Sequence, residues 1–312
     1  MATPKIAAVF TCYEWDEFNQ RQYQRFVAKC EGLTPNIVYD CSRKPFPDPA
    51  LKNVYQFDAN KALGMGFVFA YYKNLFWWNL DYLMWMFVDQ NPDYDYYMFA
   101  DYDAVFNIGI ESLVREVARQ GVDFVGETIP ETNENWVYRK PHLPLYGNAL
   151  NPYMIPVVIF SNRAAHFLKG KRLEQSEAYR RGDMPFWPFC EAFIGSELAI
   201  AANFRCDTLG NYVNHPGLHW NPIHRESELP ELSSWQVLHP VLDDVRYIKT
   251  RLKYSDRTKD VIKDGLDCIA RVKSLPLSTK GKLLLDEVRH RVRGGLQRRF
   301  GSPKTDTTEL SW

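Results

Sequence analysis

Short apolar runs alternate with segments of helical periodicity over the first 240 residues of the chain. Continuous apolar character predicts buried strands, at 6–12, 36–40, 53–57, 96–100, 122–126 and 153–160. Apolar residues at helical spacing predict helices between them, at 17–30, 66–88, 110–119 and 162–170. This alternation predicts an α/β fold, in which helices cover both faces of a mostly parallel, Rossmann-like sheet in three layers.

Two long loops and a change of pattern complete the outline of the fold. Residues 127–152 and 180–188 have no periodicity, and the segment 189–203 that follows becomes helical in its second half. Beyond residue 240 the strand-like runs stop, and amphipathic helices are predicted at 243–252, 256–274 and 279–300. We therefore expect a domain at 1–240 and a helical C-terminal extension at 241–312.

Composition narrows the class of protein. Hydrophobic residues make up 46% of the chain, which excludes a disordered protein. Lys+Arg and Asp+Glu are equal at 38 each, which argues against a nucleic-acid partner. Six scattered cysteines without a CxxC pair indicate a reducing compartment without disulfides or zinc. With no apolar run long enough for a signal peptide near the start, we expect a cytoplasmic protein.

Two segments bear on membranes. The most apolar one, 66–88, is interrupted by Lys73 and Asp81, so a helix in the core is favoured over a spanning one. The segment 289–304 contains six basic residues of the Arg and Lys types and no acid. It could lie against anionic phospholipid at the inner face of a membrane or be a solvated tail.

The strongest chemical signal is the pair Asp101 and Asp103, directly behind the strand at 96–100. Ligands of open α/β sheets bind beyond the carboxyl ends of the strands. In an extended backbone, residues two apart point to the same side, so both carboxylates could face one ion. Oxygen ligands of this kind suit Mg²⁺ or Mn²⁺ beside a phosphorylated substrate. An ordinary acidic turn is the alternative.

The chain resembles nucleotide-sugar-dependent glycosyltransferases of the GT-A fold. The resemblance rests on the strand that ends in ADYDAVF (residues 100–106) and on the N-terminal strand that ends in Thr11-Cys12-Tyr13. It also rests on the helix with Lys73, on the loop and strand around 152–160, and on the acidic segment CEAFIGSEL (residues 190–198). It covers about residues 4–240 and is architectural. It implies nucleotide-sugar binding within about 1–126 and acceptor binding within about 127–240.

The resemblance also implies a metal site. In such enzymes the last acid of the motif ligates Mn²⁺ or Mg²⁺, and the first contacts the donor. Asp103 is therefore expected to bind the metal, and Asp101 to orient the donor, for which a UDP-sugar is favoured, and to share the metal. A histidine often completes the metal site. The preferred candidates are His239 and His215, ahead of His219 and His224.

Two glutamates could serve as the general base that an inverting transfer needs. Glu191 lies among aromatic residues, where burial would raise its pKa toward the useful range. Glu197 lies on the following helix, where it could equally be a structural pair. Glu191 is the preferred base, together with Asp103 in the catalytic set; in a retaining enzyme neither glutamate would need to act as a base.

The nucleotide is expected over the ends of the first strands. Thr11 and Tyr13 could contact the base, Asp40 the base or ribose, and Lys73 the diphosphate, unless Lys73 pairs with Asp81 or Asp101. Side chains of the long loop suit stacking on an acceptor sugar but could equally form a packed lid without ligand contact, namely Trp136, Tyr138, Arg139, His142 and Tyr146.

The sequence therefore predicts a metal-dependent, hexosyltransferase-like enzyme. It would transfer a sugar to a hydroxyl of a glycan or a lipid-linked acceptor, in surface polysaccharide synthesis. The alternatives are a nucleotidyltransferase acting on sugar phosphates and a non-catalytic carbohydrate-binding protein. A phosphatase of the haloacid-dehalogenase type is disfavoured, because its DxD motif belongs on the first strand.

Overall fold

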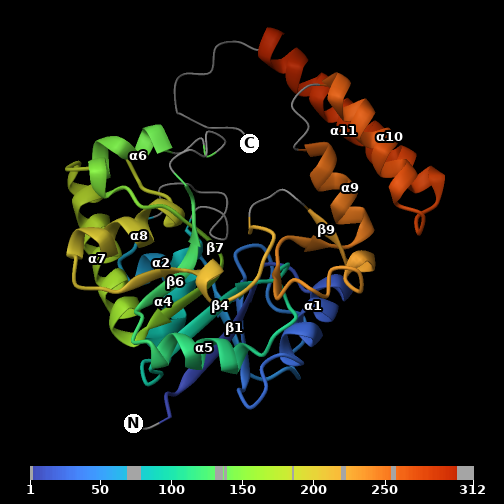
Figure 1. Cartoon of the computed structure of the whole chain (residues 1–312). Helices are drawn as coiled ribbons and strands as arrows, with labels where there is room; N and C mark the ends of the chain where they lie inside the picture. Colours follow the sequence, from blue (N-terminus) through green and yellow to red (C-terminus); the bar gives the residue numbers. More distant parts are fainter. Residues whose placement is uncertain are drawn as a thin grey trace. The chain divides into compact units, whose positions relative to one another are not determined.

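A seven-stranded sheet forms the centre of the computed structural model, in the order β3-β2-β1-β4-β7-β6-β8 (Figure 1). The structure describes residues 3–68, 79–130, 136, 139–184, 186–218, 223–253 and 258–300. The strands are β1 (Ile6–Cys12), β2 (Pro35–Asp40), β3 (Val54–Phe57), β4 (Tyr96–Asp101), β6 (Phe124–Thr128), β7 (Tyr153–Ser161) and β8 (Cys206–Thr208). All neighbouring pairs are parallel except those of β7, which is antiparallel to β4 and β6. The predicted mostly parallel sheet is confirmed.

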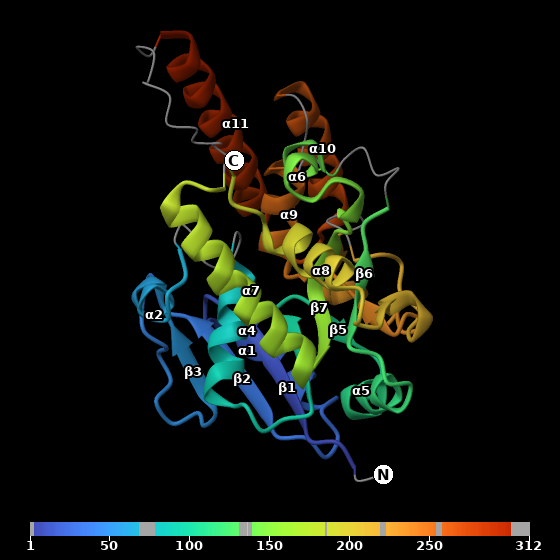
Figure 2. The same cartoon turned by 90° about the vertical axis from the view of Figure 1, so that its left-hand side faces the viewer.

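Side chains of the central strands alternate between two cores, as expected for strands buried on both faces. In β1, Ala7 and Val9 face one core, whereas Ala8 and Phe10 face the other. The first core is covered by α2 (Ala59–Gly64), α4 (Leu80–Gln90), α7 (Asn162–Arg181) and α8 (Cys190–Ala201) (Figure 2). The second core is covered by α1 (Glu17–Val27) and α5 (Ile110–Arg119). The predicted three-layer α/β arrangement is thereby confirmed.

Local sequence signals explain where these helices begin and end. The side chain of Asp16 caps α1 by accepting a hydrogen bond from the Asn19 amide at 3.1 Å, and Ser161 caps α7 in the same way. In α5 the buried residues follow at helical spacing, from Ile110 through Leu113, Val114 and Val117. Gly182 ends α7 in the left-handed region, at φ 80°.

Several elements differ from the prediction. Helix α7 continues past the predicted end at Gly170, because that glycine faces open space and nothing there interrupts the helix. The predicted loop 127–152 contains α6 (Arg139–Tyr146) and the 3-10 turn η1 (Gly147–Ala149), which Pro144 inside the helix had obscured. Helix α8 spans Cys190–Ala201, so nearly the whole of the predicted segment 189–203 is helical and not only its second half.

The pairing of strand β7 with β4 stops one residue before the end of β4. Its pairing with β4 ends at Ala100↔Val157, and its register with β6 shifts between Val125 and Glu127. Next in register comes Pro156, which has no N–H to donate to a neighbouring strand, so proline is typical of such an irregularity. The chain beyond Ala100 is therefore released from the sheet on the β7 side.

Smaller elements follow the sheet in the same part of the chain. The two-residue strand β5 (Val105–Phe106) pairs antiparallel with β10 (Val237–Leu238), and the 3-10 turn η2 (Leu209–Asn211) follows β8. By its internal contacts the chain divides into two compact units, residues 1–222 with 231–241 and residues 223–230 with 242–312, and β11 (Val241–Leu242) lies at their boundary.

The second unit is mostly helical. Its elements are β9 (His224–Arg225), the 3-10 turn η3 (Glu226–Glu228), α9 (Asp244–Lys253), α10 (Thr258–Arg271) and α11 (Leu277–Phe300). Gly265 allows α10 and α11 to pack closely, because a Cβ there would lie 2.5 Å from Leu284. No helix within the described ranges is long and apolar enough to span a membrane. Residues 69–78 of the predicted helix 66–88 lie outside those ranges.

Candidate active site

Asp101 is the last residue of β4, and its neighbour in register on β1 is Thr11. The Thr11 hydroxyl lies 2.9 Å from Asp101 Oδ1 and 3.0 Å from the Ala100 carbonyl oxygen. Tyr102 and Asp103 form a turn, which the hydrogen bond from the Ala104 amide to the Asp101 carbonyl closes at 2.9 Å. The two acids therefore converge through a turn and not, as predicted, through an extended backbone.

A short ribbon brings His239 to these acids. Strand β5 follows the turn directly and pairs with β10, so the residue after Leu238 arrives beside the turn. A second backbone bond, from the Val241 amide to the Asp103 carbonyl at 2.8 Å, fixes the chain on the other side of the histidine. Two antiparallel contacts thus bracket His239, and they place its ring beside Asp103.

Asp101, Asp103 and His239 form a compact group of potential metal ligands. One ligand atom from each lies within 4.8 Å of the others, and His239 Nε2 is 3.4 Å from Asp103 Oδ1. His239 Nδ1 lies 2.9 Å from the Leu218 carbonyl oxygen, which can only accept, so the proton is on Nδ1 and Nε2 faces the carboxylates. Asp103 and His239 are buried and Asp101 is half-buried; no other such trio occurs in the described part of the chain.

Burial and mutual proximity set the charge state of this group. Burial, and next the negative charge of Asp103, raise the pKa of Asp101 to about 8. Burial acts to lower the pKa of His239, but the carboxylates of Asp103 and Asp101 outweigh it and raise that pKa above its ordinary value. Both shifts indicate a concentration of negative charge that a cation would relieve.

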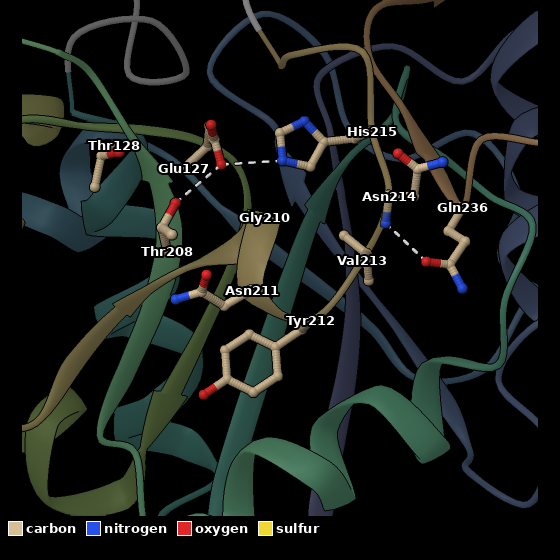
Figure 3. Close-up of a pocket in the computed structure, with 10 residues that line it drawn as sticks. All are labelled: Glu127, Thr128, Thr208, Gly210, Asn211, Tyr212, Val213, Asn214, His215 and Gln236. Atoms are coloured by element: carbon tan, nitrogen blue, oxygen red, sulfur yellow. Dashed lines mark hydrogen bonds and ion pairs between the residues drawn. The ribbon is translucent and has the colours of Figure 1, made fainter.

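The structure separates the candidate histidines. His239 lies with the two aspartates, whereas His215 lies in a pocket, 3.1 Å from Glu127 Oε2 (Figure 3). His224 is buried in the second unit, and His219 lies outside the described residues. The expectation that His215 is a ligand alongside His239 therefore finds no support in this arrangement, because its ring nitrogen faces Glu127.

Glu191 is in the first turn of α8, where its Oε2 accepts a hydrogen bond from Trp136 Nε1 at 2.9 Å. Burial raises the pKa of Glu191, and the bond from Trp136 lowers it in part. The negative charge of Glu191 is the smallest of the influences that act on the pKa of Asp101. Glu197 faces elsewhere, since its Oε1 accepts from Gln175 Nε2 of α7 at 2.7 Å.

The residues predicted to bind the nucleotide border the ends of β1 and β2. Thr11 is fully buried beside Asp101, so its hydroxyl orients that acid, and a direct contact with the base remains a prediction. The Tyr13 ring packs edge-on against Tyr102 at 5.4 Å. Asp40 is buried at the end of β2 and accepts from the Ser42 amide at 2.9 Å. Lys73 lies outside the described residues.

The aromatic residues predicted to stack on an acceptor sugar are largely packed inside the protein. Trp136 and Tyr146 belong to a buried cluster with Ile129 and Leu150, and His142 is fully buried with its Nε2 accepting from the Phe189 amide at 3.1 Å. These three residues thus follow the alternative of a packed lid. Arg139 lies over the Trp136 ring at 5.8 Å, and Tyr138 is not among the described residues.

Three groups of the site were missed by the sequence prediction. Thr11 and Trp136 were predicted for other roles, and what was missed is the hydroxyl of Thr11 on Asp101 and the indole of Trp136 on Glu191. The Leu218 carbonyl on His239 was not predicted at all. The β1–β4 pairing could have indicated Thr11, because parallel neighbours in the middle of a sheet place equivalent ends together. No sequence signal marks a backbone carbonyl.

Three solved structures that resemble this chain are all glycosyltransferases of low sequence identity to it. No protein-family model matches the chain, and no curated protein matches it. Among solved structures, the chain is similar to a glycosyltransferase involved in glycosylation of the major capsid of PBCV-1 (10% identity, TM-score 0.36, covering 84% of this chain and 100% of that one). It is also similar to mouse xyloside xylosyltransferase 1 (10% identity, TM-score 0.45, covering 75% of this chain and 97% of that one). A third similar structure is the galactosyltransferase LgtC (9% identity, TM-score 0.40, covering 88% of this chain and 99% of that one). The TM-scores of these three structures are below 0.5, so these likenesses carry no argument about function.

Proposed function

We propose that this protein is a metal-dependent glycosyltransferase that moves a sugar from a nucleotide-diphosphate sugar to an acceptor hydroxyl. The observation that carries the proposal is the convergence of Asp101, Asp103 and His239 at the carboxyl end of the central strand β4. Ligands of open α/β sheets bind at this edge. The GT-A resemblance of the sequence leads to the same class of enzyme.

The three side chains fit a divalent cation such as Mn²⁺ or Mg²⁺. Metal–ligand bonds of about 2.1 Å place neighbouring octahedral ligands about 3 Å apart and opposite ones about 4.2 Å apart. The observed 3.4 Å between His239 and Asp103, and the limit of 4.8 Å for the group, need only small side-chain movements to match. Two carboxylates and one imidazole also leave positions for diphosphate oxygens and water.

A cation held there would neutralise charge that develops on the diphosphate leaving group. Thr11 keeps Asp101 pointed at the site, and the Leu218 carbonyl fixes the ring of His239 in the tautomer that directs Nε2 to the site. The turn at Tyr102 and Asp103 lies beside Tyr13, so the nucleotide would rest over the ends of β1 and β2, near Asp40.

Glu191 is the proposed general base for an inverting reaction. Trp136 holds Oε2, and the carboxylate would take the proton of the acceptor hydroxyl as the new glycosidic bond forms. The raised pKa makes this carboxylate a stronger base than an exposed glutamate. The proposed acceptor is a glycan or a lipid-linked molecule. The proposed role is surface polysaccharide synthesis, with peripheral contact to a membrane.

Isothermal titration with Mn²⁺ and UDP, GDP, CMP or dTDP tests this function directly. We expect one of these nucleotides to bind only when Mn²⁺ is present. Asp103→Asn should abolish that binding and turnover while the thermal melt stays near that of the wild type. Glu116→Gln, which changes an exposed acid of α5, is the control and should bind normally.

Two outcomes would count against the proposal. Absence of metal-dependent binding of every nucleotide sinks the transferase assignment. Binding of a nucleoside triphosphate with release of pyrophosphate from a sugar phosphate would instead indicate a nucleotidyltransferase.

A further inference from the structure

A polar pocket of about 630 Å³ lies at the carboxyl ends of β6 and β8 (Figure 3). Its size is within the range of small-molecule sites, about 300–1,000 Å³. The residues that line it are Glu127, Thr128, Thr208, Gly210, Asn211, Tyr212, Val213, Asn214, His215 and Gln236. Resting on the proposed function, we propose that this pocket binds a neutral saccharide unit of the acceptor glycan.

The centre of the pocket is a carboxylate in a fixed orientation. His215 Nδ1 accepts a hydrogen bond from the Gly217 amide at 3.0 Å, so in the neutral ring the proton is on Nε2, which faces Glu127 Oε2 at 3.1 Å. The Thr208 hydroxyl donates to the same oxygen at 3.1 Å. The other carboxylate oxygen of Glu127 points away from both partners in Figure 3.

The charge of this carboxylate is stabilised in place. Burial acts to raise the pKa of Glu127, but hydrogen bonds from His215, Thr208 and the Gly210 amide outweigh it and lower that pKa. Glu127 is therefore ionised at neutral pH and accepts hydrogen bonds only. Groups that donate to it, such as sugar hydroxyls, suit this position.

The rest of the lining selects the class of ligand. The ten residues include amides, hydroxyls and a phenol, but no lysine or arginine. A phosphate or other anion would meet the Glu127 carboxylate without a compensating cation. Val213 is the only aliphatic residue in the lining, so a lipid chain would find little apolar surface. A neutral ligand rich in hydroxyls matches these groups.

Two chain segments connect the pocket to the aspartate–histidine site. His215 in the pocket is three residues before Leu218, whose carbonyl holds His239. Gln236 in the pocket is three residues before His239 itself, along β10. Three residues of extended chain span about 10 Å. The pocket is therefore placed to hold a sugar unit near the reacting one, which makes it a specificity site for the acceptor.

Saturation-transfer NMR with methyl glycosides of galactose, glucose, mannose and N-acetylglucosamine tests the inference. At least one should bind the wild type, and titration gives its Kd. Glu127→Gln removes the negative charge and should weaken binding at least tenfold, since hydrogen bonds to charged groups are the stronger ones. Asn214→Ala, which shortens a lining side chain, should weaken binding about two- to tenfold. The matched control is Glu116→Gln, which should bind like the wild type.

Metal-dependent nucleotide binding separates this inference from the proposed function. Loss of glycoside binding in Glu127→Gln, with nucleotide binding retained, supports it. If no glycoside binds the wild type while a nucleotide does, the saccharide pocket is refuted and the transferase assignment survives; if neither binds, both fall. Should Glu127→Gln fold poorly, Asn214→Ala decides, and unchanged affinity in that variant overturns the inference.

Discussion

Replacing Thr11 by valine removes the hydroxyl that orients Asp101 but keeps the shape of the side chain. The residue is fully buried between the ends of β1 and β4, and its hydroxyl lies 2.9 Å from Asp101 Oδ1. The hydroxyl has one proton, which Asp101 Oδ1 shares with a second acceptor, the Ala100 carbonyl oxygen at 3.0 Å. In the valine variant a methyl group faces the carboxylate, and one oxygen of a metal ligand loses its support.

The size of the effect follows from the kind of bond that is lost. Hydrogen bonds to charged groups contribute about 1.5–3 kcal/mol, and each 1.4 kcal/mol corresponds to a factor of ten in affinity. The expected loss in Mn²⁺ affinity is therefore about 10- to 100-fold, the range typical of residues that support a metal ligand. Thr11→Ser is the matched control, since it keeps the hydroxyl and removes a methyl group worth about 1 kcal/mol.

The two variants should produce opposite patterns. Electron paramagnetic resonance of free Mn²⁺ measures the affinity, and a thermal melt measures the stability. Thr11→Ser should bind Mn²⁺ like the wild type and melt about 2–4 °C lower, whereas Thr11→Val should bind weakly. Normal Mn²⁺ affinity in Thr11→Val would refute the positioning role, and equal losses in both variants would assign Thr11 to packing alone.

Other predictions concern the base and the core that supports it. Glu191→Gln should abolish transfer in a kinetic assay while titration still detects nucleotide binding; retained activity rules Glu191 out as the base. Because a base acts only when ionised, activity should rise with pH through the raised pKa of Glu191, and Trp136→Phe should move this acid limb of kcat/KM to higher pH. An unmoved limb would contradict the contact. Arg172→Leu leaves Asp81 buried without its partner at 2.6 Å and should cost about 3–5 kcal/mol in urea unfolding. The double variant with Asp81→Leu should recover most of that loss, and a single-variant loss below about 1 kcal/mol would be inconsistent with the ion pair.

The sheet was predictable where burial is two-sided. Strands such as β1 and β4 consist of unbroken apolar runs because helices cover both faces. The direction of β7 was not predictable, because an apolar run has the same composition whichever way the strand points. Helix α6 was missed since Pro144 inside it is typical of a loop, whereas Tyr146 at its end packs with Trp136 in a buried cluster.

The candidate site was predictable in its acids and ambiguous in its histidine. Asp101 and Asp103 follow a strand whose end faces the ligand edge, so their position can be inferred locally. The choice between His239 and His215 depends on which segment pairs with β5, and the two residues of β10 are too few to carry a sequence pattern. The role of Glu127 was missed altogether because its partner, His215, belongs to a distant segment.

The ribbon of β5 and β10 has a consequence for the order in which the protein matures. The seventh strand of the sheet ends at Thr208, so the β10 half of the ribbon is synthesised after every strand of the sheet. Both carboxylates are then in place, but the imidazole arrives only when residues 237–241 have been synthesised and paired with the turn at Asp103. The two carboxylates are therefore encoded before the imidazole, and we expect a chain cut before residue 237 to bind Mn²⁺ more weakly than the full chain.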